Sequence, residues 1–342
     1  MGWWDPAIAV AGLVVGVVVG LTGMGGGALM TPILVFFFGV PPLAAVSSDV
    51  VASFFMKPIG GIVHLRRGTV HLGLVTWLCL GSIPGAFTGV LVLRALGGGE
   101  RMQELLLVAL GVILVTAAAA MAIKAYLKLR ERERLRGQPD VAEPRLSTVP
   151  VRRVATVLVG LGGGLVVGMT SVGAGSLMIV CLLLLYPTIR TSQLVGTDLV
   201  QAVPLVAAAS LGHILFGDFT MGLTGSILVG AIPGVWLGAR VSSRTPGSLV
   251  RRALTVVMLA SGTKLLGAST GLVAAVTLAS VVVGVATWAV VRVRHGEAAL
   301  VWQQRRRYRE REAGATTPAA SGTDPETAPL LTGTTGQSVT DS

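Results

Sequence analysis

A glycine-rich pattern occurs twice in this chain, 148 residues apart. The first copy, GLTGMGGGALM at residues 20–30, aligns with GMTSVGAGSLM at residues 168–178. Beyond these clusters the offset becomes 149, and Ser48-Asp49 aligns with Thr197-Asp198, His64 with His213, and residues 81–89 with residues 230–238. Apolar chains match one another easily, but Asp, His and Pro are rare here. Their recurrence at one offset therefore predicts an internal duplication.

Each copy contains apolar segments of membrane-spanning length. They lie at roughly 7–22, 28–40, 43–63, 72–93 and 103–123, then at 154–170, 176–187, 194–215, 220–240 and 250–267, with a further segment at 272–291. About 20 helical residues cross the hydrocarbon core, so most segments can span it, whereas the second segment of each copy is too short. Only 13% of the residues are charged, against about 25% in soluble domains. The chain is therefore predicted to be an all-α polytopic membrane protein.

Positive charge is concentrated in two polar stretches. Of 27 Lys and Arg residues, 9 lie in residues 124–153 and 7 in residues 292–342. Basic residues that flank spanning segments hold loops on the cytoplasmic side, so we expect a cytoplasmic central loop and C-terminus, in the cell (inner or plasma) membrane. This distribution argues against nucleic acid as a partner. If all five segments of a copy cross the membrane, the two repeats are inverted. Re-entrant hairpins in place of two crossings in each copy would leave the loops on the same sides of the membrane, so the charges do not distinguish the two models.

These boundaries divide the chain into five regions. They are a first transmembrane repeat (1–123), a basic cytoplasmic loop (124–153), a second transmembrane repeat (154–270), one extra transmembrane helix (271–291), and a basic and then disordered cytoplasmic tail (292–342). Alternating charges over residues 124–143 favour a helix that extends out of the membrane before the loop begins. From about residue 314 the tail is poor in large apolar residues, which predicts disorder.

The two glycine clusters are the candidate binding site. Glycines interrupt a helix, and the next segment then begins with unpaired N–H groups at the positive end of its dipole, where an anion can bind inside a protein-lined cavity. Short, glycine-interrupted segments in matching positions of two halves indicate the binding site of a transporter. The candidate substrate-binding residues of this kind are Thr22, Gly25, Gly26, Gly27, Thr170, Ser171, Gly173 and Gly175, with Ser176 as a further hydroxyl donor.

Other glycines and two prolines are expected to shape the helices. Gly12, Gly16 and Gly20, matched by Gly160, Gly164 and Gly168, have the four-residue spacing of helices that approach each other closely, and we assign these six to packing. Pro84 and Pro233 lie in the middle of their segments, and each precedes a glycine. A proline kinks a helix, so these two residues are candidate hinges, although a kink that improves packing is the simpler interpretation.

Ionisable side chains inside the apolar segments are few, and each is a candidate for charge chemistry. Lys57 has an apolar counterpart in the second copy and is a candidate ligand of an anionic substrate. Asp49 and Asp198 lie near the starts of their segments, where helix capping competes with ion coupling as their role. His64 and His213 recur at equivalent positions and are candidates for ion coupling through a proton relay. No cysteine pattern has metal-ligand spacing, so we expect neither a metal nor a cofactor.

The order of these motifs resembles one known family. The glycine-rich residues 20–30 leading into Thr31-Pro32, the Ser47-Ser48-Asp49 segment, the GSIPG block at 81–85 and their copies resemble the sulfite exporter TauE/SafE family over roughly residues 7–270. The resemblance implies that sulfite, sulfonates or related small anions move across the bacterial inner membrane, coupled to an ion gradient. The second copy departs from the pattern, with Ser171 and Ala174 where the first has Gly23 and Gly26, and with Ile179-Val180 in place of Thr31-Pro32. The two halves are therefore not expected to contribute equally to the site.

The predicted function is a secondary transporter, an exporter of a small anion such as sulfite or a sulfonate, with alternating access between the two repeats. Its expected partners are that anion, the lipid bilayer and a coupling proton or sodium ion, and a homo-oligomer is left open. An anion channel and a membrane scaffold or assembly protein are the alternatives. An enzyme is not expected, because the membrane segments carry few ionisable groups and no cofactor motif.

Overall fold

The computed structural model describes residues 4–22, 26–66, 68–97, 99–136, 150–173, 175–187, 189, 191–241 and 247–294. Within these ranges the regular structure is entirely helical, as the sequence predicts. The helices are α1 (Pro6–Thr22), α2 (Gly27–Phe38), α3 (Pro42–Arg66), α4 (Leu72–Ala95), α5 (Glu100–Arg136), α6 (Arg153–Thr170), α7 (Leu177–Leu185), α8 (Thr191–Phe216), α9 (Met221–Val241), α10 (Gly247–Leu265) and α11 (Thr270–Arg294). The helices up to Gly284 form one compact unit, which is described here by itself.

The lengths of the helices match the predicted apolar segments closely. Among the described residues, six helices are long and apolar enough to cross a membrane, namely α3, α4, α5, α6, α8 and α9. In contrast, α2 has 12 residues and α7 has 9. At 1.5 Å per residue they are about 18 and 14 Å long, roughly half of the hydrocarbon thickness. The expectation that the second segment of each half is too short to span is confirmed.

The long helix α5 continues past the apolar segment to Arg136. The predicted helical extension of residues 124–143 is therefore confirmed as far as residue 136. The remainder of the central loop, apart from residues 150–153, and the tail beyond residue 294 lie outside the described residues.

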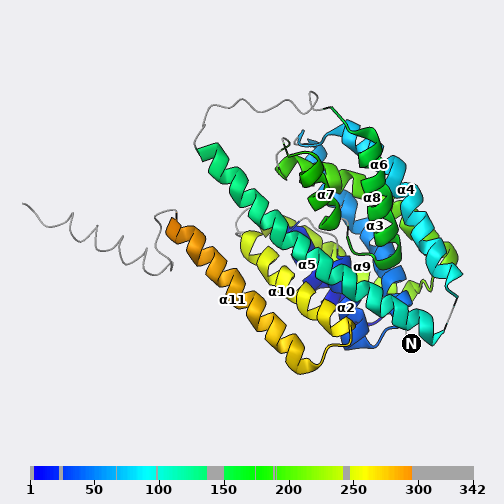
Figure 1. The fold of residues 1–342 in the computed structure, drawn as a ribbon. Helices are drawn as coiled ribbons and strands as arrows, with labels where there is room; N and C mark the ends of the chain where they lie inside the picture. The colour runs from blue at the N-terminus through cyan, green and yellow to red at the C-terminus, as the bar shows by residue number, and fades with distance from the viewer. Residues whose placement is uncertain are drawn as a thin grey trace, which may run out of the picture. The chain divides into compact units, whose positions relative to one another are not determined.

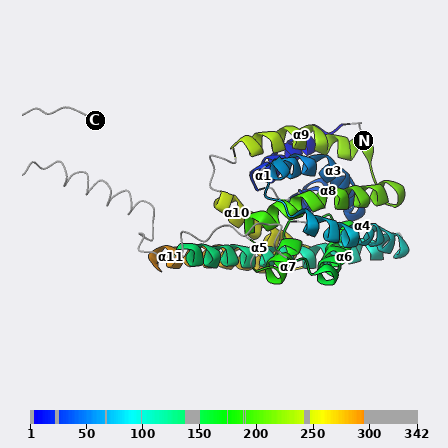
Figure 2. The same cartoon turned by 90° about the horizontal axis from the view of Figure 1, so that it is seen from above.

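Two helix pairs are held together by glycines. α4 lies beside α6 (Figure 1), and α1 lies beside α9 (Figure 2). A Cβ added to any of the six glycines assigned to packing, on α1 or α6, would overlap the backbone of α9 or α4 respectively. The same holds in return for glycines on the partner helices, which are Gly81, Gly85 and Gly89 of α4 and Gly230, Gly234 and Gly238 of α9. The packing role of the six glycines is confirmed, and close backbone contact is how helices associate where lipid removes the hydrophobic driving force.

Helices α3 and α8 form the centre of the unit. They run antiparallel, since Ser47 near the start of α3 contacts His213 near the end of α8, while Gly61 of α3 packs against Leu199 and Val203 of α8. α3 also packs against α9, and α8 against α4, so the two glycine-lined pairs flank the central pair on opposite sides (Figure 2). α5 and α10 pack against each other, also antiparallel: Gly111 contacts Leu266, and both Met121 and Met258 line one cavity.

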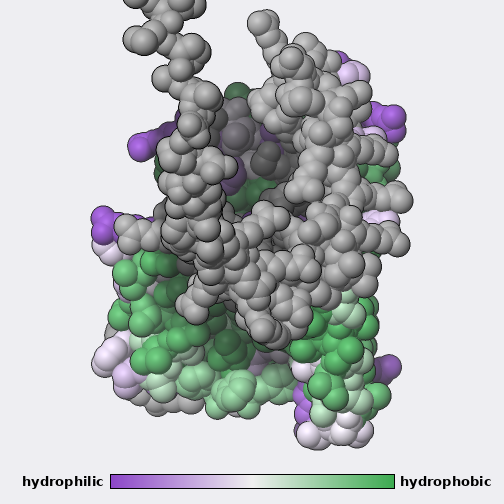
Figure 3. All heavy atoms as spheres, turned by 90° about the vertical axis from the view of Figure 1, so that its left-hand side faces the viewer, coloured by the Kyte–Doolittle hydropathy of each residue, from purple (hydrophilic) through white to green (hydrophobic). Residues whose placement is uncertain are grey.

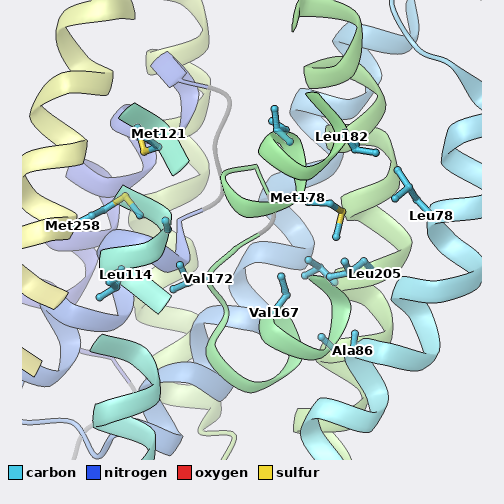
Figure 4. Packing of buried hydrophobic residues seen from close by; sticks show 14 of the residues in the cluster. Leu78, Ala86, Leu114, Met121, Val167, Val172, Met178, Leu182, Leu205 and Met258 are labelled. Atoms are coloured by element: carbon cyan, nitrogen blue, oxygen red, sulfur yellow. The ribbon is translucent and has the colours of Figure 1, made fainter. Parts of the chain in front are cut away.

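Apolar side chains fill the interior and also cover much of the outside. In Figure 4, Met121, Leu114 and Met258 lie on one side of the buried cluster, and Met178 and other apolar side chains lie on the other. Large apolar side chains are exposed as well, including Phe37, which is 81% exposed. Figure 3 shows a broad apolar surface, with hydrophilic residues toward its margins. Such an exterior is suited to contact with lipid rather than water.

Candidate functional site

A small cavity lies where the two glycine clusters meet. Its walls come from the end of α1, the start of α2, the segment between α6 and α7, and the facing sides of α5 and α10. The lining residues are Val18, Val19, Thr22, Ala28, Leu29, Met121, Ser171, Val172, Gly173, Gly175, Ser176, Leu254 and Met258. Segments about 150 residues apart in the chain thus share one cavity. Its volume is about 20 Å³, which is room for a water molecule but not for a polyatomic anion.

The second glycine cluster folds into a tight break between α6 and α7. Three described residues of this break have positive φ, at 59° for Ser171, 121° for Gly173 and 92° for Gly175. Ser171 ends α6 with its N–H bonded to the Val167 carbonyl at 2.8 Å. A left-handed conformation costs a residue with a Cβ about 1 kcal/mol or more, and such local strain is concentrated at functional sites. Ser171 stands where the first cluster has a glycine, so its side chain is the notable feature of this break.

The first cluster touches the second directly. A Cβ added to Gly27 would overlap the carbonyl of Ser171, so the start of α2 approaches this break as closely as a glycine permits. Gly26 lies beside the Asp49 carboxylate, because a Cβ added to Gly26 would lie 3.7 Å from Asp49 Oδ1. Gly25, the remaining candidate of this cluster, lies outside the described residues. Close packing alone accounts for glycine at position 27, whether or not a ligand binds there.

Asp49 joins three helical segments at a fully buried position. Its Oδ2 accepts hydrogen bonds from Ser171 Oγ at 2.6 Å and from Thr31 Oγ1 at 3.3 Å. Its Oδ1 has no hydrogen-bond partner among the described residues. The capping interpretation is wrong for both aspartates, because Asp49 and Asp198 lie about two turns inside α3 and α8.

Asp198 is buried, and the described residues give its carboxylate few hydrogen bonds. Neither carboxylate oxygen completes a hydrogen bond with a described residue, although the amide of Gly175 approaches it. Lys57 of α3 interacts electrostatically with both Asp198 and Asp49, and Lys124 of α5 interacts with Asp198. Lys57 is buried, but it does not line the cavity. The structure thus places this cation within electrostatic range of the two aspartates and outside the cavity lining.

The two histidines predicted as coupling candidates lie apart from the cavity lining. His213 is fully buried and uses both ring nitrogens: Nε2 donates to the Gly168 carbonyl at 2.8 Å, and Nδ1 accepts from Ser47 Oγ at 2.9 Å. His64 is only partly buried, and its Nδ1 lies 3.0 Å from Thr69 Oγ1. His213 therefore ties α8 to α3 and α6, while His64 is held at the end of α3. Their role in coupling stays a prediction.

Further polar residues near the centre were not predicted from the sequence. Gln201 of α8 donates from Nε2 to Ser82 Oγ of α4 at 2.6 Å, and its buried Oε1 has no partner among the described residues. Ser53 is also buried with an unpaired hydroxyl in that set. The sequence held one signal for Ser53. Asp49, Ser53 and Lys57 are spaced by four residues and so share one face of a helix.

The candidate site therefore has two parts. Of the predicted substrate-binding residues, Thr22, Ser171, Gly173 and Gly175 line the cavity, together with Ser176. Gly26, Gly27, Thr170 and Lys57 lie outside that lining. Pro84 and Pro233 lie within α4 and α9, which continue through them as helices. The arrangement can offer hydroxyl donors and helix starts to an anion, and it places a buried charge cluster directly behind them.

Comparison with known proteins gives one consistent result. The family model described as Sulfite exporter TauE/SafE matches residues 8–265. The probable membrane transporter protein YjnA of Bacillus subtilis is 34% identical over 263 residues, which are 76% of this chain and 99% of that protein. The probable membrane transporter protein YdhB of the same organism is 23% identical over 252 residues, 73% of this chain and 96% of its own length. The probable membrane transporter protein MJ0441 of Methanocaldococcus jannaschii is 28% identical over 172 residues, 47% of this chain and 59% of its own. No solved structure matches the chain.

Proposed function

Given that this chain belongs to the sulfite exporter TauE/SafE family of multi-pass membrane transporters, we propose that it exports a small anion, such as sulfite or a sulfonate, across the cell membrane. In this proposal it is a secondary transporter that binds the anion between its two halves. The family name and the chemistry of the cavity support the same class of substrate.

The observation that carries the proposal is the meeting of both glycine clusters at one cavity. α2 and α7 both begin there, and the positive end of a helix dipole attracts an anion. Ser176 lines the cavity, where its hydroxyl can donate to a ligand. Ser171 adds a second hydroxyl. Lys57 lies behind the wall and contributes positive charge without direct contact.

The helix pairing supports two inverted repeats. Exchanging α1–α5 with α6–α10 turns the α1–α9 pair into the α6–α4 pair, and it leaves the α3–α8 and α5–α10 pairs unchanged. Both of the unchanged pairs are antiparallel, as a twofold axis in the membrane plane requires. α4 and α6 run parallel, since Gly81 packs on Val157 and Gly89 on Leu165. The duplication found in the sequence accounts for all of these relations.

The same pairing supports the proposed orientation. The start of α6 lies beside the start of α4, where Arg153 stacks on the ring of Trp77 at 5.2 Å. Arg66, at the end of α3, therefore lies at the same end of the unit, because only a short turn separates α3 from α4. Basic residues gathered at one end favour a cytoplasmic location for that end. The central loop starts from this end as well.

The proposed alternating access includes a change in the size of the cavity. At about 20 Å³ the space admits no sulfite-sized anion, so in this scheme the cavity widens before the anion binds. Opening requires the two halves to shift along the glycine-lined contacts. Pro84 and Pro233 lie beside glycines in those contacts and are the proposed hinges.

Transport in proteoliposomes tests the proposal. Purified protein is expected to move sulfite with saturable kinetics, and Ser176→Ala is expected to raise the KM about tenfold through loss of one hydrogen bond to an anion. Ser210→Ala is the matched control, because Ser210 is buried, donates to the Val50 carbonyl and lies outside the cavity. Absence of flux for sulfite and sulfonates would remove this substrate class. Flux that fails to saturate and ignores ion gradients would instead identify an anion channel.

A further inference from the structure

Ser171 belongs to the cavity and to the buried charge cluster at the same time. It lines the cavity, and its Oγ donates to Asp49 Oδ2 at 2.6 Å. A hydroxyl carries one proton, and an ionised carboxylate can only accept. While Asp49 is ionised, the proton of Ser171 is therefore directed away from the cavity. An anion there would meet the lone pairs of Ser171 and a carboxylate charge directly behind them, and both repel it.

We propose that Asp49 takes up the proton that couples this transporter, and that its protonation turns the Ser171 hydroxyl toward the anion. This inference rests on the proposed function and specifies its coupling ion. A hydronium ion gives its proton to Asp49 Oδ2 and becomes water, and the new O–H donates to Ser171 Oγ. The Ser171 proton is then free to rotate toward the cavity and to donate to the anion. The only covalent changes are the O–H bond that hydronium loses and the O–H bond that Asp49 gains, and the proton returns to water when the anion leaves.

The surroundings of Asp49 favour such a switch. The elements around it contribute two hydroxyls, from Thr31 on α2 and from Ser171 after α6. Oδ1, which has no partner among the described residues, leaves room for a second hydrogen-bonding arrangement. Lys57, on α3 itself, is the described charged group that interacts with Asp49. Asp198 on α8 also interacts with Lys57, and Lys124 on α5 interacts with Asp198. The positive charge of Lys57 is thus shared between the two carboxylates.

The second half cannot form the same switch. At the position equivalent to Thr31 it has Ile179, and the residue equivalent to Ser171 is Gly23. Accordingly, Asp198 has no hydroxyl partner among the described residues. One proton site therefore serves one anion site. Because each ligand strengthens the binding of the other, the anion and the proton travel in the same direction. The proposed export is therefore driven by the concentration gradient of the anion and not by the inward proton gradient.

The experiment measures anion binding and proton uptake together. Methanesulfonate is the probe, because its charge is constant between pH 5.5 and pH 8, and calorimetry in buffers of different ionisation enthalpy counts the protons taken up. In the full-length protein, affinity is expected to rise as pH falls, by at most about tenfold per pH unit for one linked proton. Binding is expected to take up protons, up to one per anion. Binding that is independent of pH, or that releases protons, overturns the inference.

Two variants and a control locate the proton. Asp49→Asn places a permanent donor against Ser171, so binding is expected to be independent of pH and to take up no proton. Ser171→Ala removes the hydroxyl, and affinity at low pH is expected to fall about tenfold with a weaker pH dependence, because only the charge of Asp49 then repels the anion. Asp198→Asn is the control, and its binding should keep the pH dependence. Unchanged pH dependence in both of the first two variants overturns the inference while leaving anion transport intact. Failure of wild-type protein to bind sulfite and methanesulfonate at any pH overturns the proposed function itself, and the inference with it.

Discussion

The contact between α4 and α6 predicts opposite outcomes for two substitutions made two residues apart. In Gly164→Ala the new Cβ would lie 2.8 Å from the Cα of Ser82 and 2.9 Å from its carbonyl carbon. Carbon atoms pack at about 3.5 to 4.0 Å, so the helices must separate by roughly 1 Å. In Gly162→Ala, on the same helix, the new Cβ would meet no atom within 4 Å. The pair therefore isolates the close contact from every other effect of adding a methyl group.

The magnitudes follow from two opposing terms. Replacing glycine by alanine inside a helix is favourable by about 1 kcal/mol, and this gain applies to both positions. Overpacking costs about 1 to 3 kcal/mol, and it applies to Gly164 alone. Separation of α4 from α6 also moves Ser82, whose Oγ accepts the 2.6 Å hydrogen bond from Gln201. We expect Gly164→Ala to be less stable than Gly162→Ala by about 2 kcal/mol.

Reversible unfolding in mixed detergent micelles, followed by circular dichroism, measures this difference directly. Both variants have the same composition, so detergent binding and expression are matched. If Gly164→Ala proves as stable as Gly162→Ala, the backbones of α4 and α6 do not approach as closely as described. The close glycine packing would then be refuted for this helix pair, which is one of two such contacts between the proposed halves.

Three further outcomes are expected. Tyr186→Phe should cost about 1 to 3 kcal/mol in the same unfolding assay, because the lost hydroxyl accepts from the Arg152 amide at 2.8 Å and bonds to Thr156 Oγ1 at 2.6 Å. Ile179→Thr should give Asp198 the hydroxyl partner it lacks. Its cost should therefore be about 1 kcal/mol lower with Asp198 present than in an Asp198→Leu background, and equal costs would contradict the correspondence of the two halves. A fluorescent reporter fused after the last residue should fluoresce, and a periplasmic phosphatase at that place should be inactive; the reverse pattern would contradict a cytoplasmic C-terminus.

Much of the scaffold could be predicted because membrane-spanning helices can be recognised from the sequence. A run of about 20 apolar residues has few alternatives in lipid, since every backbone group must find an internal partner. The short α2 and α7 were evident for the same reason. Glycines spaced by four residues indicated packing faces on α1 and α6. The same spacing occurs at residues 81–89 and 230–238, the partner faces, which were not predicted from the sequence.

The site was harder to predict because it depends on contacts between distant segments. Ser171 and Asp49 are 122 positions apart, and no periodicity sets the register between a helix break and a helix in the other half. The capping interpretation of Asp49 and Asp198 failed for a local reason. The predicted segments at 43–63 and 194–215 begin close to the helix starts at Pro42 and Thr191, so both aspartates already lay a turn or more inside them. An N-cap residue precedes the first helical turn, which excludes this role at either position.

The two proposed repeats share glycines where their helix backbones pack closely, and they differ at buried polar positions. Each half must present glycines to the other, because inverted halves pack through the same surfaces twice. Charge follows the opposite logic, since every additional ion buried in a low-dielectric interior raises the cost of desolvation. A second lysine opposite Lys57 would add such a cost without adding a second substrate, and Val206 stands there instead. Three of the positions where the copies diverge, at Thr31, Ser171 and Lys57, interact with Asp49, which agrees with the proposal that the transport chemistry is concentrated there.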